Sequence, residues 1–268
     1  MKPFFMSFPH SGEQVPPEAS WLNGLNEVVL MRDVDRYVDR LYEPVVQKLG
    51  FPIVKSPWHR YAVDLNRYPE DVDPSTIKDY PQVERAQHFA SGIHWRETTQ
   101  MEVLMREPMT LETHQQLIEK YYWPFHNGIK QQIEQFKMQG AKNVFHIDAH
   151  SMPSRGTEKH PDPGQDRAEV VVSDVKGTSC SERFKDLVIS AYESVGFQVA
   201  YNWPYIGGRI TEIYGDPAQG QHTIQVELNR KMYMNEETRL WEDAAAPDFS
   251  KRLCEAVEKI YQEMDGVI

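Results

Sequence analysis

The stretch RDVDRYVDRLYEPVVQKLGFPIVK, residues 32–55, predicts an amphipathic helix followed by a strand. Its apolar residues recur at the spacing i, i+3, i+4 and i+7, which places their side chains on one helix face. These residues are Val34, Tyr37, Val38, Leu41, Tyr42, Val45, Val46 and Leu49. Gly50 follows directly, where helices commonly end, and residues 52–55 are typical of a strand. We therefore expect a helix over residues 34–49 between two strands, the first being the apolar run at residues 4–8.

The same alternation of strands and helices continues along the chain. Further strands are predicted at residues 61–65, 144–148, 169–173, 198–201 and 223–228. Further helices are predicted at residues 112–139, with a bend at Pro124, and at residues 181–195 and 249–264. Strands that alternate with helices form mostly parallel sheets with helices on both faces. The sequence thus predicts a three-layer αβα fold around a mostly parallel, mixed sheet, in one domain over residues 1–268.

The composition is that of a globular protein, with 40% hydrophobic and 26% charged residues. The net charge of −11 argues against nucleic-acid binding, because an acidic surface repels phosphates. No stretch approaches the roughly 20 apolar residues of a membrane helix, so no membrane partner is expected. Cys180 and Cys254 form no CxxC pair, which excludes a thiolate zinc site. A disulfide between the two stays open, and two reduced thiols in a cytoplasmic protein are the favoured interpretation. Any metal must then be bound by histidines and carboxylates.

Polar residues follow the first predicted strand in the segment Pro9-His10-Ser11-Gly12-Glu13. Ligands of α/β sheets bind beyond the carboxyl ends of the strands, so this loop is a candidate site. His10 and Glu13 are three residues apart and can converge on one divalent metal from a turn. The motif is short and common, and by itself it fits a surface turn with a half-exposed histidine better than a metal site.

A second candidate is the segment His146-Ile147-Asp148-Ala149-His150-Ser151. His150 is expected just after the strand at residues 144–148, where it can bind metal through one ring nitrogen. The other ring nitrogen then needs an acceptor, for which Asp148 is a neighbouring candidate. His146 falls inside the strand, and we interpret it as a structural residue.

The strand at residues 223–228 contains a carboxylate, Glu227, among apolar neighbours. A buried carboxylate is costly unless it is paired or used, and burial raises its pKa towards that of a general base. The alternative is a structural ion pair with Arg230 or Arg209. Glu227 is therefore a candidate general base or a member of a structural ion pair.

Arginines gather at another predicted strand end, in the segment Arg60-Tyr61-Ala62-Val63-Asp64-Leu65-Asn66-Arg67. A guanidinium binds carboxylates with two parallel hydrogen bonds and stabilises oxyanions, so the cluster favours an anionic substrate. Arg209 follows Gly207-Gly208, a pair that lets the backbone approach a ligand closely. Neutralisation of nearby surface acids is the alternative explanation for these arginines.

Taken in order, these motifs resemble the N-formylglutamate amidohydrolase (deformylase) family. They are PHSGE, RDVDRYVDRLY, RYAVDLNR, DAHSMPS, GTSC, GGRITEIYG and QVELNRKMYMNE, and they run from residue 9 to residue 236. The family is similar to the zinc carboxypeptidases and to aspartoacylase. The resemblance therefore implies a zinc-exopeptidase-like, phosphorylase/hydrolase-like αβα fold.

The resemblance also implies a role for each candidate residue. A divalent metal, Zn²⁺ by analogy, would be bound by His10, His150 and either Glu13 or Asp35. Glu227 would be the general base and Arg60 would polarise the carbonyl. Asn66 and Arg67 would bind the substrate carboxylate. Gly208 and Arg209, indicated by the glycine pair described above, are further substrate-binding candidates.

The implied reaction is hydrolysis of N-formyl-L-glutamate to formate and L-glutamate, as in histidine catabolism. Two alternatives stay open: a related metallohydrolase with another N-acyl amino acid or peptide substrate, and a carboxylate-binding protein without turnover. In each case the expected partner is a small anionic molecule. Assembly into a homo-oligomer is also open.

Overall fold

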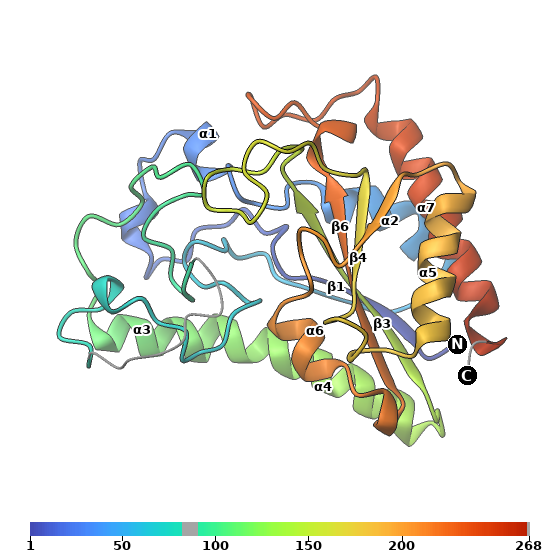
Figure 1. The fold of residues 1–268 in the computed structure, drawn as a ribbon. Helices are drawn as coiled ribbons and strands as arrows, with labels where there is room; N and C mark the ends of the chain where they lie inside the picture. Colours follow the sequence, from blue (N-terminus) through green and yellow to red (C-terminus); the bar gives the residue numbers. More distant parts are fainter. Residues whose placement is uncertain (82–90, 267–268) are drawn as a thin grey trace.

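The computed structural model describes residues 1–81 and 91–266 (Figure 1). Within this part of the chain, six strands form one sheet in the order β2-β1-β3-β6-β4-β5. The strands are β1 (Phe4–Phe8), β2 (Ile53–Lys55), β3 (Val144–Met152), β4 (Val170–Ser173), β5 (Val199–Tyr201) and β6 (Gln221–Asn229). Neighbouring strands pair in parallel, except that β4 runs antiparallel to β6. The mostly parallel, mixed sheet predicted from the sequence is confirmed.

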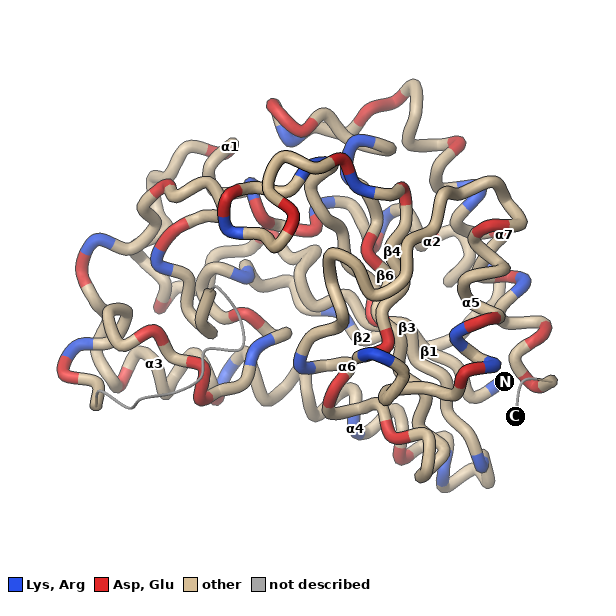
Figure 2. The backbone as a smooth tube through the Cα atoms, in the orientation of Figure 1, with Lys and Arg blue, Asp and Glu red and all other residues tan. Residues whose placement is uncertain are grey.

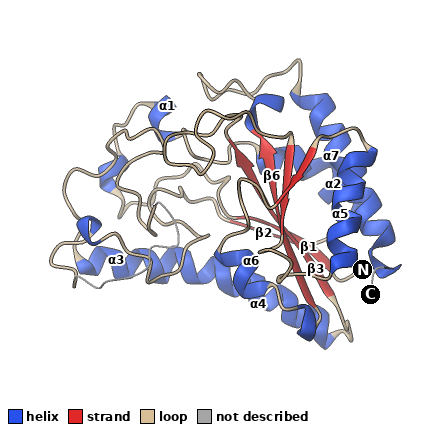
Figure 3. Ribbon diagram, in the orientation of Figure 1, coloured by secondary structure: helices blue, strands red, loops and turns tan. Residues whose placement is uncertain are grey.

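Helices cover both faces of this sheet (Figure 3). One face carries α2 (Val38–Leu49), α5 (Glu182–Ser194) and α7 (Ala246–Glu263), which pack on one another. The other face carries α4 (Trp123–Met138), which continues from α3 (Leu111–Leu117) through a π-helical turn at Ile118–Tyr122. The short helices are α1 (Glu27–Leu30) and α6 (Arg209–Tyr214), with 3₁₀ turns at Ser20–Leu22, Pro74–Thr76, Pro217–Gln219, Arg230–Met232 and Met264–Gly266. The three-layer architecture is therefore as predicted, and no helix in the described residues is both long and apolar enough to cross a membrane.

The loops beside the sheet account for much of the remaining chain. They include residues 9–37, 56–81 and 91–110, which lie together on one side of the sheet (Figure 1). Charged residues of both signs are spread along these loops (Figure 2). The structure thus places a loop-rich, mixed-charge region against one face of the sheet.

Two sequence predictions about single elements were wrong, and a third element is irregular where the sequence predicts a bend. The helix expected from residue 34 begins at Val38, because Tyr37 has a left-handed backbone with φ of 70°. Residues 34–37 are therefore a loop, which frees Asp35 from the helix. Residues 61–65 form turns instead of a strand, with backbone contacts such as Ala62 N–H to His59 O and Asp64 N–H to Ile93 O. The long helix expected at residues 112–139 is found at residues 111–138, and a π-helical turn interrupts it just before Pro124, whose missing N–H cannot continue the hydrogen-bond ladder.

Strand β3 is longer than predicted, and its alternation orients the polar residues. It ends at Met152, so His150 lies inside the strand and not after it. Alternate side chains of a strand point to opposite faces. Phe145, Ile147 and Ala149 pack into the core under α2, α5 and α7. His146, Asp148 and His150 consequently face the opposite, loop-rich side, and Glu227 of β6 lies directly beside His150 in the register.

Candidate active site

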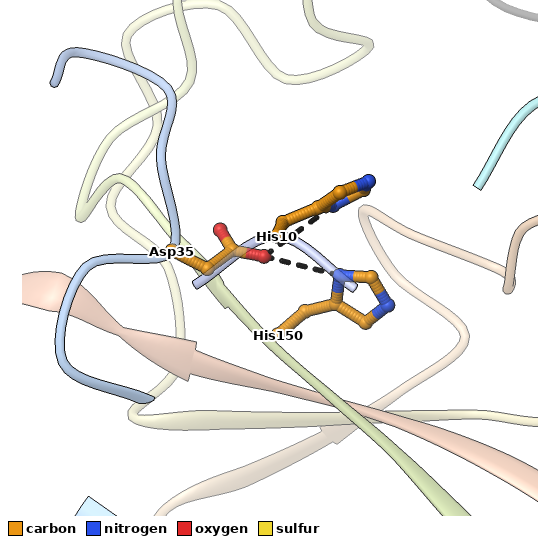
Figure 4. A group of neighbouring side chains, drawn as sticks. All are labelled: His10, Asp35 and His150. Carbon is orange, nitrogen blue, oxygen red and sulfur yellow. Dashed lines mark hydrogen bonds and ion pairs between the residues drawn. The ribbon is translucent and has the colours of Figure 1, made fainter. Parts of the chain in front are cut away.

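Three side chains from separate parts of the chain converge on one point (Figure 4). His10 follows β1 by two residues, Asp35 lies in the loop before α2, and His150 is in β3. Their potential ligand atoms all lie within 4.8 Å of one another, and all three residues are buried. Asp35 Oδ2 is 3.1 Å from His150 Nδ1 and 3.6 Å from His10 Nδ1. Two imidazole nitrogens and a carboxylate oxygen therefore face a common centre.

The second nitrogen of His10 is held by Asp64. His10 Nε2 lies 2.8 Å from Asp64 Oδ1, and Asp64 also accepts hydrogen bonds from Arg60 and from the Trp95 indole. Burial alone would raise the pKa of Asp64, but His10 and Arg60 hold it well below its usual range. Since this ionised carboxylate can only accept, His10 carries its proton on Nε2. Its Nδ1 is then a bare lone pair, buried and without a hydrogen-bond partner among the described residues.

A bare, buried imidazole nitrogen beside a buried carboxylate is what a divalent cation requires of its ligands. An unsatisfied buried acceptor costs about 1–3 kcal/mol, which a cation at this point would offset. Two histidines and one carboxylate form a donor set suited to zinc and leave an open coordination position. The residues present therefore fit a metal held by His10 Nδ1, Asp35 Oδ2 and His150 Nδ1.

A chain of hydrogen bonds holds the second ring nitrogen of His150. Its Nε2 lies 2.7 Å from Asp148 Oδ2, and the Ser7 hydroxyl donates to Asp148 Oδ1 at 2.5 Å. The Ser7 proton is used in that bond, so His146 Nε2, at 2.7 Å, must donate to Ser7 Oγ. Burial lowers the pKa of His146 to about 4, which keeps it neutral. The chain fixes the orientation of His150, as hydrogen bonds behind metal-binding histidines generally do.

The Asp35 carboxylate is fixed through its other oxygen. Asp35 Oδ1 accepts hydrogen bonds from the Ser151 hydroxyl at 3.1 Å and from Arg230 at 2.9 Å. Burial would raise the pKa of Asp35, but the hydrogen bond from His150 and the positive charge of Arg60 lower it well below its usual range. Asp35 is therefore ionised, with Oδ2 turned towards the histidines.

Glu227 is the general-base candidate, and it lies next to His150 across the parallel pair of β3 and β6. Only 6% of Glu227 is exposed, and its Oε1 accepts a hydrogen bond from Gln225 at 2.9 Å. Burial raises the pKa of Glu227 to about 7. A carboxylate with this pKa can both accept and donate a proton near neutral pH.

These residues line a cavity of about 330 Å³, which is large enough for a small metabolite. Its described walls carry four cationic side chains, Arg60, Arg67, Lys159 and Arg230, and three carboxylates, Asp33, Asp35 and Glu227. A bound divalent cation would give this space a clear positive excess. The cavity is therefore suited to an anionic ligand.

The remaining predicted residues divide into two groups. Arg60, Asn66, Arg67 and Gly208 line the cavity. Glu13 lies outside the metal-binding group and forms an ion pair with Arg36 at 2.8 Å. Arg209 is absent from the described cavity wall, because its guanidinium stacks on the rings of Tyr68 and Tyr122.

Sequence reasoning overlooked Asp64, Ser7 and Lys159. Asp64 stands in the quoted segment RYAVDLNR, four residues after Arg60, and this spacing was the available signal. Ser7 is a single hydroxyl in an apolar strand, which by itself indicates little. Lys159 lies in the loop between β3 and β4, where no pattern connects it to the metal-binding residues.

Comparison with known proteins gives a consistent result. The sequence profile of the N-formylglutamate amidohydrolase family matches residues 2–234. The N-formylglutamate deformylase of Pseudomonas putida is 28% identical over 241 residues, covering 87% of this chain and 82% of that protein. The corresponding protein of Pseudomonas aeruginosa is 28% identical over 240 residues, covering 88% and 83%.

Solved structures agree with these sequence matches. The crystal structure of N-formylglutamate amidohydrolase from Ralstonia eutropha superimposes with a TM-score of 0.83 at 27% identity, covering 97% of this chain and 93% of that one. A protein of Agrobacterium tumefaciens shares the fold with a TM-score of 0.71 at 16% identity, covering 98% and 92%. On the match over most of its length, this chain belongs to the N-formylglutamate amidohydrolase family.

Proposed function

We propose that this protein hydrolyses N-formyl-L-glutamate to formate and L-glutamate, with Zn²⁺ bound by His10, Asp35 and His150. The observation that carries the proposal is the bare Nδ1 of His10, buried opposite Asp35 Oδ2 in the same cavity as Glu227. The names of the Pseudomonas relatives supply the substrate, and the cationic cavity is compatible with its two carboxylates. Both cysteines are buried free thiols, which supports a cytoplasmic location as part of this proposal.

The chain's own residues account for proton transfer in this reaction. When bound, the metal supplies a Lewis acid that lowers the pKa of a water molecule and polarises the formyl carbonyl. Glu227 accepts the proton of the attacking water and then donates it to the departing amine nitrogen. Its pKa of about 7 suits both steps at neutral pH.

Two arginines supply fixed positive charge around the reacting groups. Arg60 lines the cavity and is held by Asp64 Oδ2 and by the carbonyl oxygen of Asp33, so it is oriented before substrate arrives. Preorganised positive charge of this kind stabilises a developing oxyanion. Arg67 lines the same cavity and is proposed to bind the α-carboxylate. Asn66 shapes this wall by accepting the Ile210 N–H, and Gly208 packs against it where a Cβ would collide.

The proposal is tested by Glu227→Gln, with Glu13→Gln as the matched control. Glu227→Gln should retain metal, measured by atomic absorption, and lower the rate of formate release by about 100-fold or more, since a general base contributes this much. Glu13→Gln alters a residue paired with Arg36 and should retain both metal and turnover. Near-normal turnover in Glu227→Gln would remove its assignment as base. Loss of metal in Glu13→Gln would transfer the third ligand from Asp35 to Glu13.

The substrate is tested separately on the wild-type protein. Formyl-, acetyl- and succinyl-glutamate should be compared, with the formyl compound cleaved fastest. Faster cleavage of another compound would reassign the acyl specificity. Tight carboxylate binding with no bound metal and no cleavage would indicate a binding protein on this fold.

A further inference from the structure

The proposed substrate carries two carboxylates, and the structure leaves the second without its expected partner. From the sequence, Arg209 is expected to bind the substrate. Its guanidinium instead lies over the rings of Tyr68 and Tyr122, and it is not among the described residues of the cavity wall. The cations that do line the cavity are Arg60, Arg67, Lys159 and Arg230. Arg67 is already assigned to the α-carboxylate, and the other three can each be assessed from their existing contacts.

Arg230 is committed to the protein itself. Its Nε donates to the Ser151 hydroxyl, one terminal nitrogen donates to the Arg32 carbonyl, and the other donates to Asp35 Oδ1. All three nitrogens therefore have acceptors, and the group serves to fix Asp35. A substrate carboxylate could bind Arg230 only by displacing buried hydrogen bonds.

Arg60 is committed through two of its three nitrogens, while its buried Nε has no hydrogen-bond partner among the described residues. Its two terminal nitrogens donate to the Asp33 carbonyl and to Asp64 Oδ2, and its guanidinium lies over the Trp95 ring at 4.8 Å. It stands beside the metal-binding group, with NH1 3.8 Å from Asp35 Oδ1. This position suits the reacting carbonyl better than a distant carboxylate.

Lys159 differs from both arginines. Among the described residues, its Nζ donates to Glu97, at 2.5 Å. The Lys159 side chain is 20% exposed and the Glu97 side chain is 42% exposed, so this ion pair borders solvent at its Glu97 end. An ammonium group has three donors, so Nζ can bind a second carboxylate while it keeps its bond to Glu97. Lys159 can therefore engage an incoming carboxylate at little cost.

The loop that carries Lys159 is well anchored. Arg167 and Asp162 form a buried ion pair with two hydrogen bonds at 2.7 Å, and Glu236 binds the backbone of Ser154. Neighbouring His160 also lines the cavity, but burial lowers its pKa to about 4 and leaves it neutral. Lys159 is thus the cation that this loop presents to the cavity.

We propose that Lys159 binds the side-chain carboxylate of the substrate and so selects N-acyl derivatives of dicarboxylic amino acids. This inference rests on the proposed hydrolase function. The side-chain carboxylate lies more bonds from the formyl group than the α-carboxylate does. It therefore reaches the solvent-bordered lysine while the formyl group meets the buried metal-binding residues.

The test compares N-formyl-L-glutamate with N-formyl-L-glutamine, which has the same shape without the side-chain charge. Lys159→Met should lower kcat/KM for the glutamate compound by about 10- to 100-fold, the range for a lost hydrogen bond to a charged group. It should change kcat/KM for the glutamine compound by less than about threefold, because the ammonium faces a neutral amide there and no pair of opposite charges is lost. Lys120→Met is the matched control, since Lys120 forms an exposed ion pair with Glu18 outside the cavity wall and should affect neither substrate.

The outcomes separate this inference from the proposed function. Equal losses on both substrates, or no loss on either, would overturn the role of Lys159 while leaving the hydrolase intact. Absence of cleavage by the wild-type protein would refute the hydrolase instead. Calorimetric binding of L-glutamate and L-glutamine would then still test Lys159, and a Lys159→Met variant with unchanged preference for glutamate would overturn the assignment.

Discussion

Asp162→Asn tests whether a buried ion pair holds the loop between β3 and β4 in place. Asp162 and Arg167 have side chains that are each 1% exposed, and their two hydrogen bonds measure 2.7 Å. Asparagine offers one acceptor oxygen, so its amide group would face an arginine N–H donor. The variant thus leaves a buried guanidinium with a lost partner. Breaking a buried ion pair from one side costs about 3–5 kcal/mol of stability.

The same loop contains a natural control. Arg155 and Asp166 form an ion pair at 2.9 Å whose side chains are 65% and 83% exposed. Water solvates both charges, so Asp166→Asn should change stability by less than about 0.5 kcal/mol. The two variants make the same chemical change and differ in the burial of the pair.

Urea denaturation of both variants, fitted for the free energy of unfolding and its slope, supplies the measurement. The loop can also open on its own, so amide exchange at Gly156 and Gly164 should be followed as well. These amides donate to the carbonyls of Gln165 and Gly156, and their exchange should accelerate in Asp162→Asn. Equal stability and equal exchange in the two variants would refute the reasoning that this buried pair holds the loop.

Two further predictions concern buried polar groups. Ser7→Ala should lower metal affinity by about tenfold or more, because it removes the hydrogen bond from Ser7 to Asp148, which in turn orients His150. Competition with a chelator measures the affinity. Ser56→Ala, at a buried serine that accepts the Trp58 N–H, is the control and should leave metal affinity unchanged. Burial lowers the pKa of His94 to about 3, so the unfolded chain takes up a proton near pH 6.5 before the folded protein does. The wild-type protein should therefore have a larger free energy of unfolding than His94→Gln above pH 6.5, and this difference should shrink by about 1.4 kcal/mol per pH unit as pH falls towards 4.5. A difference that stays constant with pH would contradict the neutral, buried state of His94.

The sequence by itself determined the layers of the fold, and it indicated His10, His150 and Glu227 as candidate residues. Period-two alternation in the strand predicted at residues 144–148 places His146 and Asp148 on one face, whereas His150 was expected after that strand and joins this face because β3 extends to Met152. The strand at residues 4–8 was likewise readable, with His10 just after it. Such features are local, because side-chain direction along a strand follows from backbone geometry alone.

The tertiary structure decided which carboxylate and which cations complete the site. Asp35 joins the histidines because the left-handed Tyr37 delays the start of α2, while Glu13 turns to Arg36. The Arg209 guanidinium packs on two tyrosine rings and is not among the described residues of the cavity wall, whereas Lys159 lines the cavity on an anchored loop. Spacing along the chain could not distinguish these outcomes, because each depends on where a loop is held by residues far away in the sequence.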